Sequence, residues 1–145
     1  GKISVAKAFE VSSNTAMVKL INENYKETPE KFVDRLYSMG LNEPLDILIS
    51  GESKPNILHP KGNKSNWSGT TLPWMSIGYG IEMTPLQILS FYAAIANDGK
   101  RMRPFFVKSI QEKGKTEKEI KPQVINPSIC SGATKLEGKA SFTSS

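Results

Sequence analysis

Three small polar residues, Ser12, Ser13 and Asn14, separate two segments of helical periodicity near the start of the chain. Side chains of this kind cap helices, because they compete for backbone hydrogen bonds. A chemical role is the other interpretation. A hydroxyl that relays a proton and a carboxamide that holds a substrate amide, presented together from a turn, suit acyl transfer. The S-x-N pattern therefore predicts either a helix cap or part of an acyl-transfer site.

A second pattern, S-x-x-K, is formed by Ser4 and Lys7. This spacing places the two side chains one helical turn apart, so the amine can accept the proton of the hydroxyl as it becomes a nucleophile. The same pattern marks the nucleophile of serine acyltransferases that bind penicillin. It is short, however, and it also arises by chance in lysine-rich helices.

Cofactor and metal sites are not expected. The G-x-G at residues 78–80 lacks the third glycine of a dinucleotide fingerprint, and Ser109 stands where a phosphate-binding loop ending at residues 114–116 needs glycine. The single His59 and single Cys130 form neither a metal-ligand set nor an internal disulfide. We therefore predict no cofactor and no metal.

The chain has 145 residues and a formal net charge of +5, a length typical of about one domain. Its lysines are scattered or interleaved with glutamates, and it has only three arginines. Nucleic-acid binding needs a clustered basic stripe with stacking aromatics, so we predict no nucleic-acid partner. No run approaches the roughly 18 apolar residues of a membrane-spanning helix, which predicts no membrane segment in this chain.

Periodicity and capping residues predict the elements that must position these groups. Helices are expected over residues 4–11 and from the Ser-Ser-Asn break to about Asn24. A third helix begins at Pro29, with Thr28 as its cap, and ends at Gly40.

The second half of the chain contains the strongest helical signal. Thr84 and Pro85 open an apolar helix that is expected to be buried and to end at residues 97–99. A short extended piece at residues 45–49, a long loop at residues 50–73, and strands at residues 105–111 and 119–125 around a turn at 113–115 complete the prediction.

The order of these segments resembles the transpeptidase domain of the penicillin-binding proteins, most closely the class B enzymes of elongation and division. The resemblance rests on two blocks, AFEVSSNTAMVKL and MSIGYGIEMTPLQILSFYAAIANDGKRMRP, and covers residues 2–131. It implies an α+β, predominantly helical fold: the helical subdomain of a β-lactamase-like transpeptidase with a C-terminal β-hairpin at residues 104–125. Residues 1–132 would be a partial transpeptidase domain. Residues 133–145 form an atypical tail, explained by a cloning scar, a frame change or a deletion.

The resemblance also assigns roles to residues. Ser12 would take part in proton transfer to the leaving amine, Asn14 would hydrogen-bond the substrate peptide, and Ser13 is the variable middle position. Ser4 lies too close to Ser12 to match the family's nucleophile, so its pattern is interpreted as a decoy. The family's K-T-G strand is missing as well, since residues 115–117 read K-T-E.

These matches imply a piece of a D,D-transpeptidase that cross-links peptidoglycan stem peptides through a serine acyl-enzyme and is inhibited by β-lactams. The nucleophile would lie upstream of Gly1, so this chain alone is expected to be inactive. The parent is expected outside the cytoplasm, on the periplasmic face of the membrane, anchored by a segment outside this chain. Other cell-wall synthesis proteins are further candidate partners, and self-association through exposed apolar surface is expected.

An alternative from another functional class stays open. A non-catalytic module can recognise a cell-wall peptide or a protein through the loop at residues 50–73, with Trp67 and Trp74 as anchors.

Overall fold

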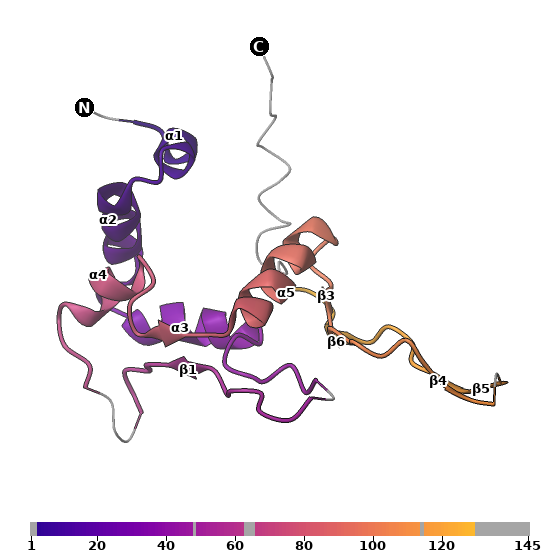
Figure 1. Cartoon of the computed structure of the whole chain (residues 1–145). Coiled ribbons are helices and arrows are strands. Elements are labelled where there is room, and N and C mark those ends of the chain that lie inside the picture. Colours follow the sequence, from indigo (N-terminus) through magenta and orange to yellow (C-terminus); the bar gives the residue numbers. More distant parts are fainter. Residues whose placement is uncertain (1–2, 48, 63–65, 114, 130–145) are drawn as a thin grey trace, which may run out of the picture. The chain divides into compact units, whose positions relative to one another are not determined.

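The computed structural model describes residues 3–47, 49–62, 66–113 and 115–129 (Figure 1). It combines helices with short strands, in agreement with the predicted α+β class. Two compact units are present: residues 1–37 with 55–82, and residues 38–54 with 83–145. Within the described ranges, no helix has the length and apolarity required to cross a bilayer. Cys130 and the tail at residues 133–145 lie outside the described residues.

The first unit is mainly helical. Its elements are α1 (Val5–Glu10), α2 (Asn14–Tyr25), α3 (Pro29–Ser38), β1 (Asn56–Ile57), α4 (Thr71–Met75) and β2 (Ile81–Glu82). The first two helices occupy the predicted segments. As expected, α3 begins at Pro29, whose fixed φ and missing N–H suit the first helical position, and Gly40 follows it with a φ of +73°.

The segment at residues 50–73 is more ordered than a plain loop. Strand β1 pairs antiparallel with β2, with Ile57 opposite Ile81, and α4 packs against α2. Leu72 and Met75 of α4 are buried. Tyr37 of α3 connects this helix to β1, because its hydroxyl donates a hydrogen bond to the carbonyl of Ile57 at 3.0 Å.

The second unit contains α5 (Pro85–Ala96), β3 (Arg101–Met102), β4 (Ser109–Glu112), β5 (Lys115–Glu119) and β6 (Val124–Asn126). The start of α5 matches the prediction. The Thr84 hydroxyl accepts from the backbone N–H of Gln87, and the Gln87 side chain accepts from the backbone N–H of Thr84, a complete capping box. Asp98 and Gly99 follow the helix with positive φ angles of 51° and 79°.

The prediction that α5 is buried was wrong for one of its faces. Gln87, Ser90 and Ala94 are buried, but Leu89 is 63% and Tyr92 62% exposed. Within the described part of its unit, α5 contacts β3 as its main strand neighbour. A helix that is apolar nearly all round leaves apolar surface in solvent when its neighbours cover one side only. This exposure agrees with the expected apolar surface.

The predicted hairpin is present, but its strand limits were wrong. Strand β4 pairs with β5, which starts directly after the turn, while β6 pairs antiparallel with β3. Pro122 lies between β5 and β6 and has no N–H to donate to a ladder, so one continuous strand over residues 119–125 is unfavourable. Residues 101–103 and 123–126 therefore form a separate pairing.

The extended piece predicted at residues 45–49 is not a strand in the part of it that the structure describes. The Glu52 carboxylate accepts hydrogen bonds from the backbone N–H groups of Leu45 and Ile47, the latter at 3.1 Å. Asp46 between them has a φ of +52°. A side chain thus satisfies donors that a neighbouring strand would otherwise bind, and the left-handed residue interrupts the extension.

Candidate functional site

The turn between α1 and α2 has a defined backbone geometry. The N–H of Ser12 donates to the carbonyl of Phe9 at 3.0 Å, and the N–H of Ser13 donates to the carbonyl of Ala8 at 2.9 Å. These are the two bonds of a Schellman motif, in which the residue after the C-cap takes the left-handed conformation. Ser12 occupies that position with a φ of +51°.

Glycine usually fills this left-handed position, because a Cβ atom raises its energy. The backbone of Ser12 is therefore locally strained. Residues with strained backbone conformations concentrate at functional sites. The side chain of Ser12 is also exposed, and it makes no hydrogen bond with the part of the chain that the structure describes. Its hydroxyl is therefore free to meet another group.

Ser13 performs the capping. Its hydroxyl accepts from the backbone N–H of Ala16 at 3.4 Å, and its own backbone is extended, with φ −74° and ψ 98°. Asn14 is then the first residue of α2, with an exposed side chain that forms no hydrogen bond among the described residues. The cap interpretation therefore holds for the middle residue, Ser13, and the chemical role of Ser12 and Asn14 stays a prediction.

The structure brings Ser12 and Asn14 to the same exposed turn but does not enclose them. A hollow of about 520 Å³ between α1 and α2 is lined by Ser13 and Ser4, among others, and not by Ser12 or Asn14. Two apolar side chains that precede the turn are exposed, Phe9 of α1 at 75% and its C-cap residue Val11 at 53%. The catalytic assignment of Ser12 and Asn14 stays a prediction from the resemblance.

The S-x-x-K group has a structural use. The Ser4 hydroxyl caps α1 by accepting from the backbone N–H of Lys7 at 3.1 Å. The Lys7 ammonium instead pairs with Glu10, with 2.9 Å between Nζ and Oε1. The Ser4 hydroxyl and the Lys7 ammonium thus each have another partner, and the interpretation of this pair as a decoy stays a prediction.

Residues 115–117, K-T-E, lie in strand β5. All of β5 is exposed. In the antiparallel ladder of β4 and β5, Lys115 lies opposite Glu112. Within the described residues, no group of three or more His, Cys, Asp or Glu side chains is arranged to hold a metal ion.

Sequence reasoning missed the role of His59. Its Nε2 lies 3.1 Å from Oδ1 of Asp34, and its Nδ1 accepts from the backbone N–H of Lys61 at 3.1 Å. With Nδ1 as the acceptor, the ring N–H at Nε2 donates to Asp34. This residue anchors the loop to α3, and neither its spacing nor its neighbours in the sequence indicate the contact.

The alternative site at residues 50–73 retains one exposed aromatic anchor. Trp74 is 51% exposed and meets Tyr79 edge to face, with 5.0 Å between ring centroids. Trp67 is half-buried. An edge-to-face pair of this kind is ordinary surface packing as well as a frequent interface element.

Similarity to known proteins is extensive. A family profile described as the penicillin binding protein transpeptidase domain matches residues 1–136. The chain is 34% identical over 123 residues to penicillin-binding protein PbpB of Mycolicibacterium smegmatis, covering 82% of this chain and 18% of that protein. The same identity, 34% over 118 residues, relates it to PbpB of Mycobacterium tuberculosis, with 81% and 16% covered.

Solved structures agree in fold. Penicillin binding protein 3 of Mycobacterium tuberculosis in complex with aztreonam matches with a TM-score of 0.62 and 32% identity, over 81% of this chain and 25% of that one. Penicillin-binding protein 2B of Streptococcus pneumoniae matches with a TM-score of 0.66 and 25% identity, over 86% and 23%. The chain thus spans less than a fifth of its PbpB relatives and about a quarter of the solved chains.

Proposed function

The chain belongs to the penicillin-binding protein transpeptidase family, and on that premise we propose that it is the part of a serine D,D-transpeptidase that carries Ser12 and Asn14. The observation that carries the proposal is the turn itself. A strained, left-handed Ser12 and the first helical residue Asn14 present polar side chains that form no hydrogen bond among the described residues, while Ser13 caps the helix.

In the proposed reaction, a serine oxygen supplied by the S-x-x-K segment attacks the carbonyl of the terminal D-Ala-D-Ala bond. The C–N bond breaks, the acyl group stays on the serine, and the leaving D-alanine amine takes a proton. The Ser12 hydroxyl passes that proton on, and the Asn14 amide holds the substrate peptide. An amine of a neighbouring stem peptide then attacks the acyl-enzyme and releases the serine.

A β-lactam would acylate the same serine, as expected of a family whose solved members include complexes with aztreonam and ampicillin. This chain contains neither the nucleophile segment nor a K-T-G strand that fits the family pattern. Members of a catalytic unit act together, so this chain alone should not turn over. The parent enzyme would work outside the cytoplasm, on peptidoglycan.

The test uses the complete enzyme and the rate constant of acylation by a fluorescent penicillin. Ser12→Ala should lower this rate by about 10²-fold or more, because proton transfer by a positioned group contributes on that scale. Asn14→Ala should lower it by roughly tenfold or more through a lost hydrogen bond. Ser13→Thr, which keeps a capping hydroxyl, is the matched control and should acylate at the wild-type rate. Unchanged rates in both Ser12→Ala and Asn14→Ala would refute the proposal.

A further inference from the structure

A cationic side chain in the second unit is buried without a counter-ion. Arg101 is 2% exposed. Its Nη1 donates to the carbonyl of Gly40 at 2.6 Å, and its Nε donates to the hydroxyl of Ser90 at 3.2 Å. Its Nη2 is buried and meets no hydrogen-bond acceptor, and no carboxylate of the described residues forms an ion pair with the group.

Such a group is costly to leave unpaired. Burial lowers the pKa of the Arg101 guanidinium, because removal from water disfavours the charged form. Arginine nevertheless stays protonated, since its ordinary pKa lies far above neutrality. A buried charge is therefore stable only when an anion or further hydrogen bonds compensate it. Two neutral acceptors supply part of that compensation here, and Nη2 remains without any.

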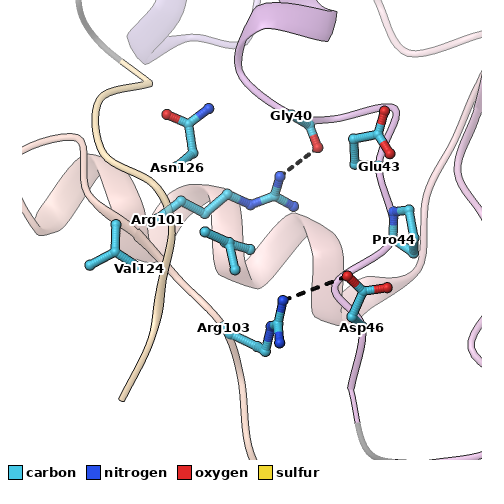
Figure 2. A pocket seen from close by; sticks show the side chains of 9 residues that line it. Gly40, Glu43, Pro44, Asp46, Arg101, Arg103, Val124 and Asn126 are labelled. Atoms are coloured by element: carbon cyan, nitrogen blue, oxygen red, sulfur yellow. Dashed lines mark hydrogen bonds and ion pairs between the residues drawn. The ribbon is translucent and has the colours of Figure 1, made fainter. Parts of the chain in front are cut away.

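The unpaired nitrogen belongs to a residue that lines a cavity of about 490 Å³. Figure 2 shows Arg101 and Arg103 reaching toward the segment that carries Gly40, Pro44 and Asp46. The charged residues of its lining are Glu43, Asp46, Arg101 and Arg103. This volume falls within the range of about 300–1,000 Å³ that is usual for small-ligand sites.

A second residue with an unpaired donor, Arg103, lines the same cavity. The Nε of Arg103 is buried and has no hydrogen-bond partner in the part of the chain that the structure describes. The rest of its guanidinium is engaged, since Nη1 donates to Gln123 at 3.0 Å and Nη2 lies 3.6 Å from Oδ2 of Asp46. Arg101 and Arg103, which both line this cavity, thus each leave one guanidinium nitrogen without a hydrogen-bond partner among the described residues.

The cavity's own carboxylates do not neutralise Arg101 but restrict which anion can. Asp46 pairs with Arg103, and Glu43 accepts from the side chain of Asn42 at 3.2 Å. Two arginines and two acids line the cavity, so a dianion such as phosphate would meet two like charges. A monoanion with a planar pair of acceptor oxygens matches guanidinium donors better.

We propose that this cavity binds a carboxylate group of a peptide, whose oxygens accept hydrogen bonds from the guanidinium groups of Arg101 and Arg103. The carboxylate comes either from the C-terminus of a peptide chain or from an acidic side chain of a partner segment. The site belongs to the second unit, and it is separate from the Ser12–Asn14 turn, which belongs to the first unit. Its existence does not depend on the proposed acyl transfer.

The test titrates the complete 145-residue chain with small probes and follows the Nε–H signals of Arg101 and Arg103 by NMR. N-acetylglycine represents a terminal carboxylate, and N-acetyl-aspartate methylamide represents an acidic side chain. Neutral N-acetylglycinamide and inorganic phosphate are the comparison probes. Saturable shifts with either carboxylate and none with the amide are expected, and the tighter of the two carboxylates identifies the source.

Arg103→Gln should weaken carboxylate binding by about tenfold, the effect of one lost charge-assisted hydrogen bond. Lys108→Gln removes the same charge from an exposed position and should bind as the wild type does. Arg101→Lys keeps the charge without Nη2 and should also bind more weakly; if it fails to fold, Arg103→Gln decides. The proposal is overturned if no carboxylate gives a saturable shift, if phosphate binds more tightly, or if both Gln variants bind alike.

Discussion

The hydroxyl of Ser13 accepts a hydrogen bond from the backbone N–H of Ala16 at 3.4 Å, so the middle residue of the Ser-Ser-Asn group caps α2. Because this cap is supplied by Ser13, the hydroxyl of Ser12 and the amide of Asn14 are not needed to hold the turn together. Structural and chemical tasks are thus divided between adjacent residues, and the division can be tested one residue at a time.

Ser12→Gly should stabilise the chain and disable the proposed site. Glycine tolerates the φ of +51° without the steric cost that serine bears there, so the free energy of unfolding should rise by roughly 0.5–1 kcal/mol. Urea denaturation of the variant measures this gain, and penicillin acylation of the complete enzyme measures the loss of proton transfer. A destabilised variant would show that the Ser12 side chain supports the turn after all.

Ser13→Ala, in contrast to Ser12→Gly, should lower the stability of the chain. Loss of the cap should cost about 0.5–1 kcal/mol, the lower part of the usual range, because the hydrogen bond to Ala16 is long. Ser13→Thr retains a capping oxygen and should lose less. Thermal unfolding monitored by circular dichroism compares the two, and equal midpoints for wild type and Ser13→Ala would contradict the assigned cap.

Glu30 should titrate below its ordinary pKa. Its carboxylate accepts a backbone hydrogen bond at its own N–H, the main cause of the lowered pKa, and Lys61 lies 3.5 Å away as a secondary cause. Because the folded-state pKa is lowered, the resulting stabilisation is present above the unfolded-state pKa and is lost as the pH falls through the folded-state value.

Carboxyl NMR titration measures this pKa directly. Lys61→Gln should restore only part of the shift, since the backbone hydrogen bond remains. A full return to the ordinary pKa in Lys61→Gln would show that the ion pair dominates instead.

The exposed face of α5 should drive self-association. Leu89, Tyr92 and Ile95 are 63%, 62% and 51% exposed, a large apolar surface for one short helix. Leu89→Lys should lower the weight-average mass in sedimentation at high protein concentration. Asn66→Lys adds the same charge at an exposed loop position and serves as control. Equal association of the two variants would place the contact elsewhere.

The elements that were predicted well are those whose ends are determined by capping residues and prolines close by in the sequence. Thr84, Pro85 and Gln87 define the start of α5 through a capping box and a fixed φ, and Pro29 does the same for α3. The location of the Ser-Ser-Asn turn followed from the same logic.

The features that were missed depend on contacts across the chain or on unusual backbone. The Glu52 carboxylate accepts hydrogen bonds from the backbone N–H groups of Leu45 and Ile47, which prevents the expected strand. The periodicity of the sequence does not indicate such a contact. Strand β6 pairs with β3 instead of continuing the hairpin. The left-handed conformation of Ser12 was also not predictable, because serine gives no signal for positive φ, whereas glycine does.

The most direct test of the account is the intact mass of the purified chain after incubation with a fluorescent penicillin, with folding verified by circular dichroism. Wild type and Ser4→Ala should both keep their unmodified masses, because the chain carries the S-x-N turn while Ser4 only caps α1. A stoichiometric penicillin adduct on the wild type that disappears in Ser4→Ala would contradict the account and make Ser4 and Lys7 a working nucleophile pair.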